Sequence, residues 1–231
     1  MAAQLATAST ASEAAILESS QRLVLSPDWQ SPLRLAVKRA LDVMASAGLL
    51  LLLSPVFLVI ALAVKLSSAG PILYAWKVVG RGGRPFTGYK FRSMVVNADA
   101  LRAGLASCNE MTGPVFKMSA DPRITAVGAW LRRFSLDELP QLYSVLKGDM
   151  SLVGPRPPLA TEYAQFTAYQ KQKVAVKPGI TCLWQVSGRN QISDFDQWVR
   201  LDLEYIRRWS LVLDLRILWR TVGAIFSGSG K

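Results

Sequence analysis

Two adjacent carboxylates, Asp137 and Glu138, and one arginine, Arg156, have the types and spacing that indicate chemistry. They lie in residues 135–157, SLDELPQLYSVLKGDMSLVGPRP, where a turn bounded by glycine and proline separates the pair from the arginine. A carboxylate can attack a phosphorus centre when fixed cations offset the negative charge that gathers there. The stretch therefore indicates phosphoryl chemistry, and we expect the rest of the chain to be arranged around it.

The local backbone of the carboxylate pair has two interpretations. Ser135, with Glu138 three residues later, matches a capping box, but Pro140 would then lie inside the helix and cost a hydrogen bond. With Asp137 at or next to the cap, Pro140 falls in the first turn, where a missing N–H costs little. We favour the second, which places the carboxylates at the positive end of a helix dipole. From these residues alone, plain helix capping is the simpler role for both.

Composition narrows the class of protein. Lys and Arg number 27 against 16 Asp and Glu, a net charge of +11, which indicates a nucleic acid, an anionic membrane face or a phosphate-bearing substrate as partner. The hydrophobic content of 51% favours the last two, so no nucleic acid is expected. Histidine is absent, and Cys108 and Cys182 are far apart, which fits a reducing compartment. Any metal should be a hard ion held by oxygen, such as Mg²⁺.

Three regions are predicted, in a mostly helical α+β fold. Residues 1–31, rich in Ala, Ser and Thr, are expected to be a disordered tail without a signal peptide. Residues 32–68 are interpreted as a membrane helix segment. Residues 69–231 are expected to form a catalytic domain at the cytosolic face, ending in an amphipathic helix.

The membrane segment contains 22 uncharged residues, 43–64. One straight helix of this length would run about 33 Å, enough for a bilayer core of about 30 Å. However, Pro55 falls near the middle and conflicts with the carbonyl of Leu51, while Ser54 can bond back to a carbonyl left free. We therefore predict a break at Ser54 and Pro55.

The charges that flank this segment bear on its topology. Basic residues lie on both sides of it, so the positive-inside rule puts both ends in the cytoplasm. They are Arg34, Lys38, Arg39, Lys65 and Lys77. The pattern favours a re-entrant helical hairpin that enters one leaflet and returns. An ordinary kinked transmembrane helix stays open as the alternative.

Residues 71–94 have the alternation of a β-hairpin, with a glycine turn at 80–84. Lys90 and Arg92 share one face of its second strand, which faces either solvent or a phosphate. Helices are predicted at residues 97–107, 162–176 and 194–208. Within the last of these, Asp202 could orient Arg189 or another cation.

The C-terminal stretch, residues 210–228, has apolar residues at helical spacing. Trp209 and Trp219 suit a lipid headgroup layer, so we favour an amphipathic helix on the membrane surface. A helix that faces a protein core is the alternative.

Six motifs occur together and in order after the apolar segment. They are KFRSM (90–94), DPRIT (121–125), SLDELPQL (135–142), KGDMSLVGPRP (147–157), KPGIT (177–181) and SGRN (187–190). The set resembles the bacterial sugar transferase family, the monotopic polyprenyl-phosphate phosphoglycosyltransferases, over about residues 34–226. The resemblance is to the short form, without the extra N-terminal membrane helices of long relatives, and to members that initiate exopolysaccharide synthesis.

The resemblance implies a reaction. A sugar-1-phosphate passes from a UDP-sugar to undecaprenyl phosphate, giving a lipid-linked diphosphate sugar and UMP. This is the first step of exopolysaccharide repeat-unit assembly, at the cytoplasmic face of the bacterial inner membrane. The hexose is expected to be glucose or galactose, and the oligomeric state, a homo-oligomer included, stays open.

The resemblance also assigns roles to residues. Asp137 matches the nucleophile that forms a covalent phosphosugar intermediate, and Glu138 beside it binds Mg²⁺, with Asp137 as a second candidate ligand. Arg156 and Arg189 match basic residues that the resemblance implicates in phosphate binding. The residues themselves add Lys90, Arg92, Arg132 and Asp202 as expected substrate-binding residues. Two alternatives remain: a non-catalytic basic membrane adaptor of a polysaccharide assembly complex, and direct transfer without a covalent intermediate.

Overall fold

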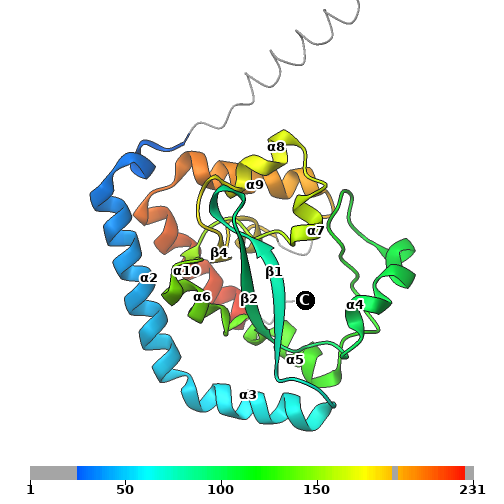
Figure 1. Ribbon diagram of the computed structural model, residues 1–231. Coiled ribbons are helices and arrows are strands. Elements are labelled where there is room, and N and C mark those ends of the chain that lie inside the picture. Colours follow the sequence, from blue (N-terminus) through cyan, green and yellow to red (C-terminus); the bar gives the residue numbers. More distant parts are fainter. Residues whose placement is uncertain (1–24, 189–191, 227–231) are drawn as a thin grey trace, which may run out of the picture.

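The computed structural model describes residues 25–188 and 192–226 and shows a mostly helical α+β fold (Figure 1). Its α-helices are α2 (Pro32–Leu52), α3 (Ser54–Ser67), α4 (Ala98–Leu101), α5 (Ala126–Arg133), α6 (Gln141–Lys147), α7 (Ala160–Tyr163), α8 (Ala168–Lys171), α9 (Phe195–Arg208) and α10 (Leu211–Phe226). Short 3₁₀ helices are η1 (Pro27–Gln30), η2 (Arg81–Gly83), η3 (Ala103–Cys108), η4 (Leu136–Glu138), η5 (Gln172–Ala175) and η6 (Trp184–Val186). The strands β1 (Leu73–Val79), β2 (Pro85–Phe91), β3 (Ser151–Val153) and β4 (Gly179–Thr181) form two small sheets. The predicted fold class is confirmed at this level.

The helices α2 and α3 meet at Leu53 with a bend of 62°. Ser54 Oγ donates a hydrogen bond to the Leu51 carbonyl oxygen at 2.8 Å, as the sequence predicted for the carbonyl opposite Pro55. Within the described residues, neither helix alone is long and apolar enough to cross a membrane, although the bent pair together has the length and composition.

Large apolar side chains of this helix pair are exposed. In Figure 1 the pair runs along the outside of the molecule, α2 in blue and α3 in cyan. The most exposed are Leu33, Met44, Leu51, Leu52, Leu58, Val59, Leu62 and Leu66. Such a surface is unusual for a protein surrounded only by water and marks an interaction site.

The first half of α2 is fixed to the folded body by polar contacts. Lys38 Nζ donates to the Val153 carbonyl oxygen at 3.1 Å and pairs with Asp214 at 2.6 Å. Asp42, also on α2, accepts a hydrogen bond from the Leu152 N–H at 3.0 Å. Because Lys38, Asp42 and Asp214 are buried, these contacts replace the water that the charges lose on folding.

The second helix of the pair packs on the same body through apolar contacts. Ile60 and Val64 of α3 are buried in one cluster with Phe91 of β2 and Leu131 of α5. Both arms of the bent pair are therefore attached to one folded unit.

The predicted β-hairpin is confirmed as the antiparallel pair of β1 and β2, with the turn at residues 80–84. Trp76 lies opposite Gly88. A Cβ at Gly88 would lie 2.4 Å from Trp76 Nε1, so only glycine leaves room for the indole ring there. The indole therefore packs closely against β2 at Gly88, next to the site described below.

The single helix predicted at residues 162–176 is wrong. The chain instead forms α7, α8 and η5. A reciprocal capping box at Thr167 and Gln170 begins a new helix at α8, and buried Phe166 lies just before it. Local capping and burial thus divide a segment whose pattern read as continuous.

The main core surrounds α9, which begins after Asp194 as predicted. Trp209 is 1% exposed and stacks on Trp29 at 4.0 Å between ring centroids, so its predicted place among lipid headgroups is wrong. Trp219 on α10 is 81% exposed, so its contact with lipid headgroups stays a prediction.

Candidate active site

Asp137 and Glu138 lie in η4, a single 3₁₀ turn between α5 and α6. The turn follows Ser135, which has the left-handed conformation φ 54°, ψ 23°. Pro140 is at the cap position of α6, which begins at Gln141. The predicted role of Asp137 as helix cap is therefore wrong. The carboxylates belong to a separate turn, because the backbone reverses at Ser135 and the next helix begins only after Pro140.

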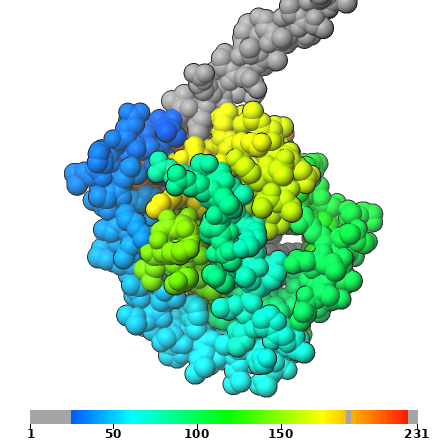
Figure 2. Space-filling view, viewed as in Figure 1, coloured from blue at the N-terminus to red at the C-terminus, as the bar shows by residue number. Residues whose placement is uncertain are grey.

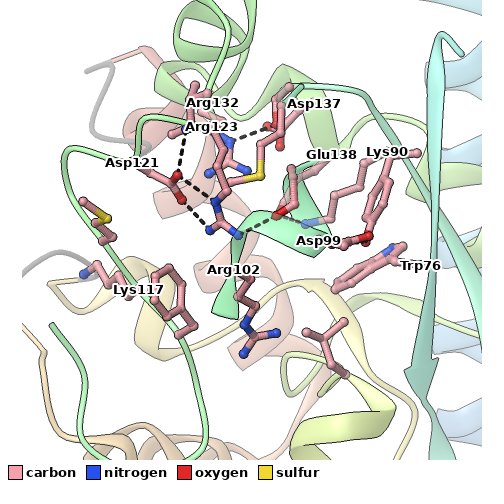
Figure 3. Close-up of a pocket in the computed structure, with 18 of the residues that line it drawn as sticks. Trp76, Lys90, Asp99, Arg102, Lys117, Asp121, Arg123, Arg132, Asp137 and Glu138 are labelled. Atoms are coloured by element: carbon pink, nitrogen blue, oxygen red, sulfur yellow. Dashed lines mark hydrogen bonds and ion pairs between the residues drawn. The ribbon is translucent and has the colours of Figure 1, made fainter. Parts of the chain in front are cut away.

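Basic side chains from three segments surround this turn, and Figure 3 labels two of them, Lys90 and Arg132. Lys90 Nζ of β2 lies 2.8 Å from Glu138 Oε1, and Arg156 Nη1 lies 3.7 Å from the same oxygen. Arg132, at the end of α5, interacts electrostatically with Asp137. Both carboxylates are buried. The structure thus brings together five of the predicted site residues, which are Asp137, Glu138, Lys90, Arg132 and Arg156.

The surroundings of Lys90 favour its neutral form more than water does. Burial lowers the pKa of Lys90, and the positive charge of Arg156 lowers it further, while the charge of Glu138 raises it. The ammonium group lies 4.3 Å from the centroid of the Trp76 ring, a cation–π distance. Trp76 is a site residue that the sequence did not single out, because its place in an alternating strand pattern gave no sign of this contact.

A cavity of about 720 Å³ opens at the carboxylate pair. Figure 2 shows an opening between the β-hairpin and the segment of α4. The walls of the cavity come from the hairpin, from residues 93–99 and 115–119, from α5 and from residues 156–159. Asp137, Glu138, Lys90, Arg132 and Arg156 all line it. The volume is in the range of pockets that hold small-molecule ligands and cofactors.

Hydrogen bonds of two arginines, Arg132 and Arg123, shape the wall of the cavity. Arg132 Nε donates to Ser93 Oγ at 2.9 Å. The pKa of Arg132 is lowered, because the effect of burial is larger than the opposing effect of the negative charge on Asp137. Arg123 of the DPRIT motif binds Asp121 through two donors, at 2.9 and 2.6 Å, and donates to the Ala98 carbonyl oxygen at 3.1 Å. Arg123 thereby holds the start of α4 in place at the edge of the cavity.

Asp202 of α9 is fully buried behind the cavity wall and pairs with Lys173 Nζ at 2.7 Å. Burial raises the pKa of Asp202, while Lys173 and the backbone N–H of Arg156 lower it. Lys173 is the side chain of this pair that lines the cavity. Among the described residues, the cation paired with Asp202 is Lys173, and Asp202 does not itself line the cavity, so its role in substrate binding stays a prediction. Sequence reasoning missed Lys173 because its segment was expected to be a regular helix.

Asp202→Asn is expected to lower the free energy of unfolding by about 3–5 kcal/mol, because it leaves Lys173 buried without a carboxylate. Adding Lys173→Met should recover much of this loss, since no unpaired charge remains. Chemical denaturation of both variants measures the difference. Glu204→Gln, which breaks an exposed pair with Arg208, is the control and should cost less than about 1 kcal/mol. A cost for Asp202→Asn no larger than for the control would contradict the assignment.

The remaining predicted substrate-binding residues are Arg92 and Arg189. Arg92 lines the cavity, but its guanidinium donates to the carbonyl oxygens of Ser68 and Ala69 at 2.7 and 2.6 Å. It therefore ties β2 to the end of α3, and its role in substrate binding stays a prediction. Arg189 lies outside the described residues.

The site contains few side chains that could ligate a metal ion. Within residues 25–188 and 192–226, no group of three or more Asp, Glu, His or Cys side chains is arranged to hold a metal ion. Asp137 and Glu138 supply carboxylate oxygens only. This set fits Mg²⁺, which is commonly bound by one or two carboxylates and completed by substrate phosphates and water. It does not fit a closed structural metal site.

Comparison with known proteins gives the family. The sequence matches the bacterial sugar transferase family over residues 33–228, and the chain belongs to it. It is 46% identical over 196 residues to the galactosyl transferase CpsE of Streptococcus agalactiae, covering 85% of this chain and 43% of CpsE. It is 43% identical over 199 residues to the undecaprenyl-phosphate galactose phosphotransferase of Salmonella typhimurium, covering 84% and 41%.

A third relative is similar in length. The chain is 39% identical over 198 residues to the exopolysaccharide production protein ExoY of Rhizobium meliloti, covering 84% of this chain and 87% of ExoY. By contrast, it spans only 43% and 41% of the length of the first two relatives. The predicted family membership is confirmed.

Proposed function

We propose that this protein transfers a hexose-1-phosphate from a UDP-sugar to undecaprenyl phosphate, with release of UMP. The observation that carries this proposal is the buried pair Asp137 and Glu138, which lines a cavity together with Lys90, Arg132 and Arg156. The names of two relatives specify galactose, which supports galactose or the related hexose glucose as the sugar. The name of ExoY, an exopolysaccharide production protein, supports a role in exopolysaccharide production. Within that role, we propose that the transfer to the lipid carrier is the first step of repeat-unit assembly.

In the first half-reaction, an oxygen of the Asp137 carboxylate attacks the phosphorus that carries the sugar. A bond between this oxygen and phosphorus forms as the bond from phosphorus to UMP breaks, and UMP leaves with the electron pair. Without screening, carboxylate and diphosphate would repel each other. The guanidinium groups of Arg132 and Arg156 lie where they can offset this charge.

In the second half-reaction, a phosphate oxygen of undecaprenyl phosphate attacks the same phosphorus. The new bond forms as the bond to the Asp137 oxygen breaks, which restores the carboxylate and yields the lipid diphosphate sugar. Two displacements in sequence mean that the water-soluble donor and the lipid need not be bound together. One cavity can therefore serve both substrates.

Glu138, together with Asp137, is the proposed holder of Mg²⁺. Such an ion supplies positive charge that stabilises the transferring phosphoryl group. In the structure, Lys90 and Arg156 approach Glu138 Oε1 and hold that carboxylate toward the cavity.

We propose that α2 and α3 form a re-entrant hairpin at the cytoplasmic face of the inner membrane. Lys38 and Asp42 attach α2 to the folded body, and Ile60 and Val64 attach α3 to the same body. One folded body cannot lie on both sides of a bilayer. The attachments thus support a hairpin that enters and leaves on one side, with its exposed apolar residues in the lipid.

The exposed face of α10 is proposed as a second membrane contact. Val212, Leu215, Trp219 and Val222 lie at helical spacing and are exposed, whereas Ile217 on the opposite face is buried. Exposed Arg216 and Arg220 lie among them. Apolar and basic residues on one face suit a surface with anionic headgroups.

A UMP-release assay tests the proposed function. Purified protein in detergent is mixed with undecaprenyl phosphate, Mg²⁺ and a panel of UDP-sugars, of which UDP-galactose or UDP-glucose should give the fastest release. Removal of Mg²⁺ with EDTA should abolish release. Failure to release UMP from any UDP-sugar, by protein that still binds membranes, would favour the non-catalytic adaptor.

Cysteine labelling tests the hairpin. In a Cys108→Ser background, Arg34→Cys and Lys65→Cys replace exposed charged residues near the two ends of the pair, and both should react with a membrane-impermeant maleimide from the cytoplasmic side. Leu52→Cys, at the bend, should be protected by lipid. Protection of one end together with its labelling from the opposite side would show a transmembrane helix and contradict the proposal.

A further inference from the structure

The helix α5 lies between the apolar helix α3 and the cavity. Leu131 and Val127, on one side of α5, pack in the cluster that contains Ile60 of α3. Ala129 and Arg133, on another side, line the cavity. A molecule that moves from the membrane toward Asp137 along this part of the surface must therefore pass α5.

The orientation of α5 is fixed by a close backbone contact. A Cβ at Gly128 would lie 2.0 Å from the Ser93 carbonyl oxygen, so the helix approaches this segment more closely than any other residue would allow. Thr125 begins the helix, with its N–H donating to the same oxygen at 3.1 Å and its Oγ1 accepting from the Gly128 N–H at 3.0 Å. Because the side of α5 that carries Gly128 is fixed against Ser93, Trp130 points toward the surface of the protein.

The outward side carries an aromatic pair and a cation. Trp130 is 53% exposed, and its ring centroid lies 5.6 Å from that of Phe134. The guanidinium of Arg133 lies 5.6 Å from the Phe134 centroid. Among residues 25–188 and 192–226, Arg133 forms no ion pair with a carboxylate. An exposed arginine at the cavity thus lies next to exposed aromatic surface.

We propose that this side of α5, formed by Trp130, Arg133 and Phe134, is the entry site for the polyprenyl phosphate acceptor. This inference rests on the proposed function. The acceptor consists of a phosphate attached to a long apolar chain, and the site contains a group that can contact each of these two parts. The fork of Arg133 suits phosphate oxygens, while Trp130 and Phe134 suit the first isoprene units at the level of the headgroups.

A simpler role for Arg133 is stabilisation of the helix, because a cation in the last turn interacts favourably with the dipole. That role does not require Arg133 to line the cavity. It also leaves unexplained why Trp130, beside an apolar membrane helix, is exposed. The two roles differ in what the removal of both side chains should do to each half-reaction.

The test compares the donor and acceptor half-reactions of Trp130→Ala/Arg133→Gln in detergent. The donor half-reaction is the burst of UMP from UDP-sugar without acceptor, and it also reports that the variant is folded. This burst should stay within about twofold of wild type, while the KM for undecaprenyl phosphate should rise about tenfold, as for the loss of one charge-assisted contact. Arg133→Lys should recover part of the change.

Tyr143→Ala/Arg208→Gln is the matched control, because Tyr143 is 55% exposed, Arg208 is exposed, and neither lines the cavity. It should leave both half-reactions unchanged. The acceptor-entry assignment would be overturned if the α5 variant had an unchanged KM for undecaprenyl phosphate. It would also be overturned if the donor burst fell by the same factor as the rate of transfer to undecaprenyl phosphate. Wild-type protein that releases no UMP would instead count against the proposed function, and against this inference with it.

Discussion

Asp137→Asn is expected to abolish UMP release from a UDP-sugar, both in the burst and in steady state. Asparagine keeps the shape of the side chain but lacks the anionic oxygen that attacks phosphorus. Loss of a covalent nucleophile typically lowers turnover by roughly 10⁴-fold or more. Measurement of UMP with excess undecaprenyl phosphate and Mg²⁺ determines the residual rate.

Asp149→Asn is the matched control for this variant. Asp149 lies in the same stretch of the chain and pairs with the exposed Lys147 at 3.0 Å, but it does not line the cavity. Its turnover should be close to that of wild type. Near-normal turnover of Asp137→Asn would contradict the nucleophile assignment and leave helix-turn structure as the role of this carboxylate.

Arg156→Gln is the second variant with a large expected effect. Arg156 lies 3.7 Å from Glu138 Oε1 and lines the cavity, where its guanidinium can bind two phosphate oxygens at once. We expect kcat/KM for the UDP-sugar to fall roughly 10²- to 10³-fold, the range seen when one donor to a developing oxyanion is removed. Arg156→Lys should lie in between, because it keeps the charge but loses the planar fork.

Arg200→Gln controls for the loss of one positive charge. Arg200 is exposed on α9 and outside the cavity, so its removal should change kcat/KM little. If Arg156→Gln behaves in the same way, Arg156 has a structural role only. If kcat/KM falls only because KM rises while kcat is unchanged, Arg156 contributes to ground-state binding of the donor and not specifically to the transition state.

The parts of the structure that could be predicted from the sequence are those decided by local chemistry. The break at Ser54 and Pro55, with its hydrogen bond to Leu51, follows from the missing N–H of proline. The β-hairpin follows from alternation and from the glycine turn at residues 80–84. In both cases the residues that determine the structure are neighbours in the chain.

Other parts depend on contacts between distant residues. Trp209 has the composition of an interfacial residue, but it is buried because Trp29 stacks on it from the other end of the chain. Lys173 lines the cavity, where it is held by an ion pair with the carboxylate of Asp202 on a different helix. The turn at Ser135 combines a left-handed residue and a proline, and no single pattern predicts this combination.

The candidate site was predicted in part. Asp137, Glu138, Lys90 and Arg156 meet in one place as the motifs indicated. The motifs fix which residue types are present, but they do not show which cations approach the carboxylates and which hold the backbone. The structure draws that distinction for Arg92, whose guanidinium binds backbone carbonyls at the end of α3.

The most direct test of the central claim is the mass of the protein after incubation with a UDP-sugar and Mg²⁺ in the absence of undecaprenyl phosphate. We predict a gain of one hexose phosphate, located on the peptide that contains Asp137, absent in Asp137→Asn and lost when undecaprenyl phosphate is added. Turnover without any such adduct at the earliest measurable times, or an adduct on another residue, would contradict the account.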